Sequence, residues 1–173
     1  MAFISGISYI GLAPVSTNGQ PAQDTDYEEI LNVKRGSVSY KAEEAQKEDL
    51  ETEQQDDPIA TILKKPGKKT FEMVIYHSDV NVLKKLMGGE VTSKKWDAPK
   101  EEITIERSLK IISRVREGVK GVFTIHHCEI KCDIENLPSA EGVFTLKMEV
   151  TRKAFTNASG QVLSPMSFEE VAA

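Results

Sequence analysis

The chain has 173 residues, a mass of 19.2 kDa and a formal net charge of −5 at pH 7, and this length fits one domain with room for an arm. No apolar run reaches the roughly 18 residues that cross a bilayer, no basic region precedes the first apolar stretch as in a signal peptide, and two cysteines are too few for a disulfide framework. The acidic balance, with a pI near 5.3, argues against a protein that clamps nucleic acid by neutralising phosphates.

The two ends of the chain predict peripheral segments. Residues 1–12 alternate weakly between apolar and polar, which is typical of an extended arm or edge strand. Pro, Gly, Asn, Gln and Asp dominate the following stretch, which is typical of a connector. We therefore expect an N-terminal arm and connector over residues 1–27, one β domain over residues 28–155, and a C-terminal tail over residues 156–173.

Most of the charge imbalance lies in residues 41–57. This segment holds eight acids and two bases, a net charge of −6, so the other residues together carry +1. Its only large apolar side chain is Leu50, and we expect that it cannot bury itself as a core element. The plain interpretation is a solvated, mobile loop. The alternative is a loop that becomes ordered against a partner of complementary charge.

The middle of the chain predicts a hairpin and then a helix. Strand patterns over residues 59–64 and 69–76 flank a Pro-Gly turn, so we expect these two strands to pair. Residues 79–87 repeat apolar side chains at helical spacing, with Ser78 as the expected N-cap and Gly88-Gly89 as the stop. A loop around Trp96 and Pro99 is expected next.

The remainder of the chain predicts further antiparallel strands. Strand patterns cover residues 103–111, 122–134 and 144–150, separated by turns. The apolar face of the second strand shifts by one residue, which predicts a β-bulge near His126-His127. Residues 167–170 resemble a capping box, which predicts a last turn of helix.

The densest cluster of reactive side chains lies at residues 126–132, with two histidines and two cysteines. A zinc site needs about four converging ligands, and Cys128 and Cys132 lie about 13 Å apart on a regular strand. We therefore expect both thiols to pack in the core and no metal to bind. Residues 67–70 lack the upstream glycine of a phosphate loop, and no nucleophile elbow occurs. The sequence predicts neither an enzyme nor a cofactor.

One order of elements carries a resemblance. The acidic segment is followed by the strand at 69–76, the helix with its Gly88-Gly89 stop, the Trp96-Asp97-Ala98-Pro99 passage, and strands that end at residues 147–151. Over about residues 36–155 this order resembles the major tail tube proteins of long-tailed bacteriophages. The helix, the glycine pair and the Trp-x-x-Pro passage are its most specific part.

The resemblance implies a mainly β fold, an antiparallel β-sandwich or barrel-like pair of sheets with one short flanking helix. It implies a virion structural protein of the phage tail, made in the host cytoplasm, whose hexameric rings stack into a tube for genome delivery. Its partners would be copies of itself and other tail proteins at the tube ends. DNA would pass without specific binding, and no membrane, metal, cofactor or small-molecule ligand is implied.

Two sets of residues follow as expected contact and channel surfaces. The first set comprises candidates for contacts between subunits or rings: Phe3, Ile4, Ile7, Tyr9, Glu43, Glu44, Glu48, Asp49, Leu50, Glu51, Glu53, Asp56 and Asp57. The second set comprises polar strand faces that are candidates for the lumen: Thr104, Glu106, Ser108, Lys110, Thr145, Lys147, Glu149 and Thr151. The alternative for the second set is the ordinary solvent face of a monomer.

Two other functions stay open at this point. A related ring protein of the same fold would form part of a short tail, a tail terminator or a secretion tube. A monomeric β-sandwich that binds a ligand or peptide with its acidic loop is the alternative from a different class.

Overall fold

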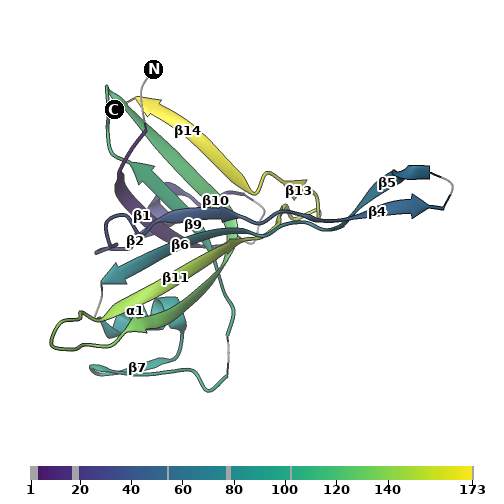
Figure 1. Cartoon of the computed structure of the whole chain (residues 1–173). Coiled ribbons are helices and arrows are strands. Elements are labelled where there is room, and N and C mark those ends of the chain that lie inside the picture. The colour runs from purple at the N-terminus through teal and green to yellow at the C-terminus, as the bar shows by residue number, and fades with distance from the viewer. Residues whose placement is uncertain (1–3, 17–19, 54, 77–78, 102, 173) are drawn as a thin grey trace.

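The computed structural model describes residues 4–16, 20–53, 55–76, 79–101 and 103–172. These residues form antiparallel sheets and one α-helix (Figure 1), which confirms the prediction of a mainly β fold with one short helix. The elements in chain order are β1 (Ile7–Pro14), η1 (Asp24–Asp26), β2 (Glu28–Glu29), β3 (Ser39–Ala42), β4 (Gln46–Thr52), β5 (Gln55–Lys65), β6 (Lys69–Tyr76), α1 (Val80–Met87), β7 (Glu90–Thr92), β8 (Lys95–Asp97), β9 (Ile105–Ser113), β10 (Val119–Asn136), β11 (Thr145–Arg152), β12 (Phe155–Thr156), β13 (Val162–Leu163) and β14 (Met166–Ala172).

Eight strands form one bent sheet in the order β2-β1-β9-β10-β11-β6-β3, with β14 paired to β10. Strand β10 is long enough to pair with two strands along the same edge. Its first half pairs with β14 and its second half with β11, while β9 pairs along its other edge. One continuous sheet therefore contains β14 beside the start of β10 and β11 beside its end.

The predicted bulge lies in the middle of β10. His126 and His127 stand opposite Ser108, between the regular pairs Ile125–Leu109 and Cys128–Arg107. Because two residues oppose one, Ile125 and Cys128 both face the core although they are three positions apart. This confirms the bulge near His126-His127.

The core lies between the sheet and α1. Met73, Ile75 and Met148 have no exposed surface, as the alternation in β6 and β11 predicts. The helix adds Leu83 and Leu86 to the same cluster. No helix among the described residues is long and apolar enough to cross a membrane.

The boundaries of α1 follow from local chemistry. Asp79 is the N-cap, and its carboxylate accepts a hydrogen bond from the Asn81 backbone N–H at 2.8 Å. Ser78, the expected cap, lies outside the described residues. At the other end Gly88 has φ 75° and donates to the Lys84 carbonyl at 2.9 Å. The predicted helix and its glycine stop are confirmed.

A short hairpin, β7–β8, replaces the loop that we expect around Trp96. The Trp96 indole donates to the Gly88 carbonyl at 2.8 Å, which fastens the hairpin to the end of α1. Gly89 has φ 85°, and a side chain there would collide with the Asp97 carbonyl. The second glycine of the pair therefore allows the close approach of β8.

Strand pairing after the acidic segment differs from the prediction. Strand β5 pairs with β4 in a separate two-stranded ribbon that projects from the body (Figure 1), whereas β6 pairs with β3 and β11. The expected hairpin of residues 59–64 with 69–76 is therefore wrong, and residues 46–52 form a strand where a loop is expected. The backbone groups of residues 46–52 find partners in β5, so this stretch forms a strand without a core of its own.

Both expected peripheral segments contain strands of the main sheet. Residues 7–14 form β1 between β9 and β2, and Ile10 is only 2% exposed, so this stretch is not a free arm. Residues 166–172 form β14 on β10 instead of a helical turn. The Phe168 ring lies 4.6 Å from the Phe123 ring, and this cross-strand contact favours strand pairing over a short helix.

Candidate interaction surfaces

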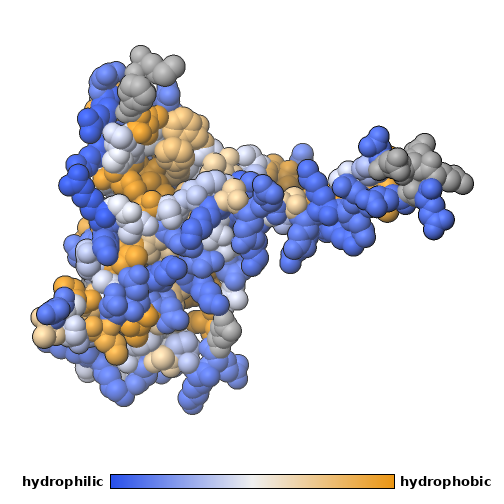
Figure 2. All heavy atoms as spheres, viewed as in Figure 1, coloured by the Kyte–Doolittle hydropathy of each residue, from blue (hydrophilic) through white to orange (hydrophobic). Residues whose placement is uncertain are grey.

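The two strands β4 and β5, which we call the ribbon, pair only with each other. Glu48 stands opposite Ile62, and Leu50 stands opposite Ala60, so these side chains share one face of the ribbon. Apolar side chains along it are open to solvent, with exposed fractions of 44% for Leu50 and 47% for Ile62. Figure 2 shows hydrophilic residues over most of this projection.

Acidic side chains crowd the outer part of the ribbon. Near its base Glu48 pairs with Lys64 at 2.7 Å, and Asp49 accepts a hydrogen bond from Thr61 at 2.5 Å. Among the described residues, no side chain pairs with Glu51, Glu53 or Asp57. The predicted contact residues at 48–53 and 57 thus lie together on the ribbon, while Glu43 and Glu44 are exposed just before it. The Asp56 side chain lies outside the described residues.

The predicted N-terminal contact residues contact their own subunit. The Tyr9 hydroxyl donates to the Tyr27 carbonyl at 3.3 Å, and Ile7 packs against the core. Ile4 lies over Gly121, where a Cβ would stand 3.0 Å from its side chain. Phe3 lies outside the described residues. Ile7 and Tyr9 therefore belong to β1 in the body of the subunit and are partly exposed there, and their contact with a second subunit stays a prediction.

The open face of the main sheet is charged and carries more acids than bases. Cross-strand partners point to the same side, and the register aligns Glu106 with Glu129, Lys131 with Glu149, and Asp133 with Lys147. Glu72 on β6 pairs with Lys41 at 2.8 Å and lies 3.9 Å from Lys147. The ion pair with Lys41, aided by the charge of Lys147, holds the Glu72 pKa below its usual value.

Part of the predicted lumen surface is not available. Ser108, Lys110 and Thr145 are buried inside the subunit. Lys110 forms an ion pair with Asp24 and lies over the Tyr27 ring, while Ser108 accepts a hydrogen bond from the Tyr27 hydroxyl at 2.6 Å and donates to the Ile125 carbonyl. A buried side chain cannot line a channel, so these three predictions are wrong.

The other predicted lumen residues are exposed or partly exposed to solvent. Glu106, Lys147, Glu149 and Thr151 lie on the open sheet face, and Thr104 is exposed just before β9. Sequence reasoning missed their neighbours on the same face: Lys41, Glu72, Glu129, Lys131 and Asp133. Only the strand order could have identified them, because each alternates as an ordinary polar residue in its own strand.

The histidine and cysteine cluster has no catalytic arrangement. Burial raises the pKa of both Cys128 and Cys132 to about 12, so both thiols stay protonated at neutral pH. The His127 Nδ1 donates to the Ala154 carbonyl at 2.6 Å, which leaves its Nε2 at 3.2 Å from a Glu106 oxygen. Among the described residues, no three His, Cys, Asp or Glu side chains converge as metal ligands.

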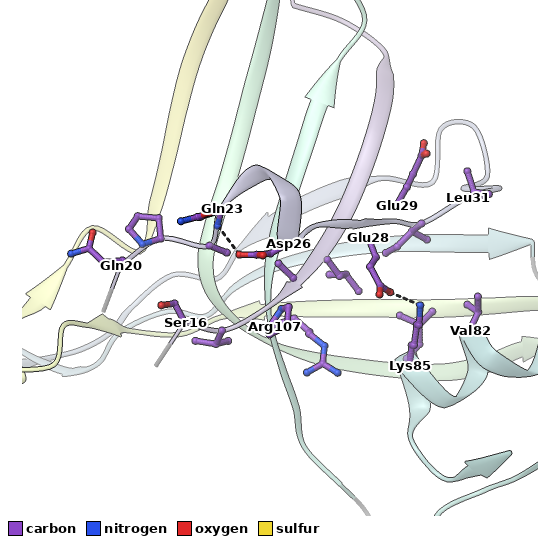
Figure 3. A pocket seen from close by; sticks show the side chains of 18 of the residues that line it. Ser16, Gln20, Gln23, Asp26, Glu28, Glu29, Leu31, Val82, Lys85 and Arg107 are labelled. Carbon is purple, nitrogen blue, oxygen red and sulfur yellow. Dashed lines mark hydrogen bonds and ion pairs between the residues drawn. The ribbon is translucent and has the colours of Figure 1, made fainter. Parts of the chain in front are cut away.

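A cavity of about 990 Å³ lies between the end of β1, the connector, β2 and α1 (Figure 3). An exposed ion pair of Glu28 with Lys85 crosses one side of it, and the Gln23 backbone N–H donates to Asp26 on the other. Arg107 reaches it from β9. Carboxylates outnumber bases along its described lining, and no nucleophile with an adjacent base lies among those residues.

Comparisons with known proteins find similarity to solved structures alone. No protein-family model matches the chain, and no curated protein matches it. The chain is similar to a solved chain in the tail of an empty GTA particle, computed by helical refinement with C6 symmetry. The identity is 13%, the coverage is 93% of this chain and 94% of that chain, and the TM-score is 0.37. A TM-score this low carries no argument about function.

Proposed function

We propose that this chain is a self-assembling subunit of a phage tail tube, a virion structural protein whose rings stack around a channel for genome delivery. The observation that carries the proposal is the isolated ribbon. A two-stranded hairpin is marginally stable at best in water unless it packs against other structure, and β4 and β5 pair with no other strand of the described chain. A second subunit would supply that packing.

The chemistry of the ribbon supports a protein partner over a small molecule. Its exposed apolar residues include Ile59 at 62% and Leu63 at 57% exposure; in β4 acids flank Leu50, and in β5 the apolar residues follow Asp57. An extended surface of this kind matches another protein surface, where apolar contacts provide affinity and charges set the register. The order of elements that resembles tail tube proteins supports the same assignment.

The charged sheet face is the proposed channel wall. Its carboxylates outnumber its lysines, and some of these charges pair with each other, as Lys41 does with Glu72. A wall of paired charges offers no continuous array of free cations, so it would release few counterions from DNA and bind it weakly. DNA would then pass without adhering. We propose Glu106, Lys147, Glu149, Thr151 and their sheet neighbours for this role.

Electron microscopy of the concentrated, purified protein tests the proposal. We expect long hollow tubes of uniform width, with dynamic light scattering that shows growth as protein concentration rises. Single closed rings that never stack would favour a ring protein of a short tail, a terminator or a secretion tube. A monomer at every concentration would contradict the proposal.

The cavity of about 990 Å³ favours the second candidate, a monomeric binding module, because its size is at the upper end of ordinary ligand sites. Such a protein would stay monomeric and would show a saturable ligand-dependent rise in its unfolding temperature. The same light-scattering experiment separates the two candidates.

A further inference from the structure

We infer that the histidine bulge of β10 holds the C-terminal segment, residues 154–172, in a pH-dependent way, so that this segment detaches locally from β10 as the pH falls. The C-terminal segment comprises the hairpin β12–β13 and the strand β14, and it begins where β11 ends beside β10. The inference concerns a single chain and does not depend on the proposed function.

Both ends of the hairpin β12–β13 are fastened at the bulge. The Lys153 backbone N–H donates to the His127 carbonyl at 3.0 Å, and the His127 Nδ1 donates to the Ala154 carbonyl at 2.6 Å. Beyond the hairpin, the His126 backbone N–H donates to the Pro165 carbonyl at 3.1 Å. The chain therefore leaves β10 and returns to it at two adjacent residues, His126 and His127.

The His126 side chain packs against the C-terminal segment. Its ring centre lies 5.3 Å from that of Phe155 on β12, a side chain that is only 3% exposed. The His126 Nδ1 is buried without a hydrogen-bond partner among the described residues, and burial lowers the pKa of this histidine. Protonation would place a positive charge and an N–H donor on Nδ1 where nothing accepts them, so it favours an arrangement in which the ring reaches water.

The neighbouring histidine responds to acid in the opposite direction. The His127 Nε2 lies 3.2 Å from a Glu106 oxygen on β9, and Lys153 pairs with Glu129, which stands opposite Glu106 in the sheet. A protonated His127 would gain an ion pair with Glu106, which strengthens the bulge. A loosening of the bulge at low pH therefore has to come from His126.

The C-terminal segment is attached mainly through its ladder with β10. None of the seven residues of β14 is buried, and within the described chain β14 pairs with β10 alone, while β12 and β13 pair with each other. Phe168 contacts Phe123 across the ladder and still has 47% of its surface exposed. Peripheral elements with few buried contacts open at a lower free energy than the core unfolds. Local opening of this segment is therefore the less costly way to bring the His126 ring to water.

Amide hydrogen exchange of the full chain in dilute, unassembled solution, followed as the pH falls from neutral, tests the inference. At every pH we expect lower protection factors in β14 than in β6 and β11. Because the folded-state pKa of His126 is lowered, the attachment is complete above the ordinary histidine pKa and weakens as pH falls towards the lowered value. The protection factors of β14 should therefore decrease below about pH 6.5, by up to about tenfold for each pH unit.

Two single variants assign the effect to one histidine. His126→Gln cannot be protonated in this range, so its β14 protection factors should not change with pH. The matched control is His127→Gln, which removes the adjacent imidazole and should keep the decrease. Circular dichroism at neutral pH checks that each variant folds.

The wild-type exchange profile decides the inference even if a variant fails to fold. Protection factors in β14 that stay constant with pH, or that equal those of β6 and β11, overturn the inference. In the variants, a decrease that persists in His126→Gln also overturns it. A decrease confined to chains that retain His126, with β14 less protected than the core strands, supports it.

Discussion

His126 occupies the bulge of β10 without a partner for its ring nitrogen. Its Nδ1 is buried and finds no hydrogen-bond partner within the described residues, and the centre of the Phe155 ring lies 5.3 Å from the centre of its ring. Burial lowers the pKa of this histidine because the charged form loses solvation and gains no carboxylate. The bulge therefore tolerates neutral His126 and disfavours the protonated form.

A pH titration of stability tests this description of His126. The unfolded chain binds the proton near pH 6.5, and the folded chain binds it only at lower pH. The free energy of unfolding should thus stay level above about pH 6.5 and decrease as pH falls between the two pKa values, by about 1.4 kcal/mol for each pKa unit that separates them. Urea unfolding at several pH values measures it.

A His126→Gln variant is the matched control for that titration. Glutamine cannot be protonated in this range, so the decrease below about pH 6.5 should disappear. The lowered pKa of Glu72 acts in a separate window, because a carboxyl with a lowered pKa loses its contribution only as pH falls below its unfolded value near 4.5. An unchanged pH profile in the variant would assign the effect to another group.

At the scale of elements, the ribbon is a part of the fold that does not stabilise the core of the body. Its two strands add no side chain to the core cluster, and the register between β3 and β6 is set by other residues. Glu43 donates its backbone N–H to the Lys68 carbonyl at 2.9 Å, so the chain ends that flank the ribbon already lie side by side.

Replacing residues 46–65 by a short glycine-containing turn should therefore leave the body folded. We expect an unfolding temperature within a few degrees of the wild type, because the core and sheet register stay unchanged, and we expect tubes to be lost. Calorimetry and electron microscopy measure the two outcomes. A deletion variant that still forms normal tubes would remove the ribbon from the assembly contact.

A second element shows why local patterns mislead. Residues 166–172 carry a serine and two glutamates in a capping-box arrangement, yet they form β14. Seven register pairs with β10, together with the contact of Phe168 on Phe123, outweigh the preference of a single helical turn. An isolated turn of helix is unstable because its nucleation is costly, whereas an exposed edge of β10 offers a ready ladder.

At the scale of the whole molecule, acidic charge is concentrated in one projection. The ribbon extends away from the body (Figure 1), and residues 48–57 hold six acids and no base. Contacts between exposed charges weaken with salt, since the screening length falls from about 10 Å at about 0.1 M to about 3 Å at about 1 M ionic strength.

We therefore expect salt to oppose assembly. Exposed ion pairs contribute about 0.2–1 kcal/mol each, so the loss of three or more should raise the protein concentration for half-maximal assembly by about tenfold over that range. Turbidity and sedimentation at increasing sodium chloride measure this. If apolar contacts alone held the subunits together, assembly would be unchanged or stronger at high salt.

The sequence by itself determined which side chains form the core and where several elements end. Alternation in residues 69–76 and 144–150 predicts the burial of Met73, Ile75 and Met148, and the glycine pair at 88–89 predicts the end of the helix. The one-residue shift of apolar face predicts the bulge at His126-His127. These features are local, because backbone geometry fixes periods of two and 3.6 residues within each segment.

Only the tertiary structure decided which strands pair and which polar faces stay open. Alternation in β5 is equally compatible with pairing to β4 or to β6. The two-residue period predicts on which face of a sheet a side chain lies, but it does not predict which strand lies beside it. Ser108 and Lys110 alternate as an outward polar face, yet the distant connector covers them with Tyr27 and Asp24. Such contacts join residues about 80 positions apart. Whether they form depends on the entropy lost in closing a long loop and on the burial gained in the complete fold, and neither can be read from one segment.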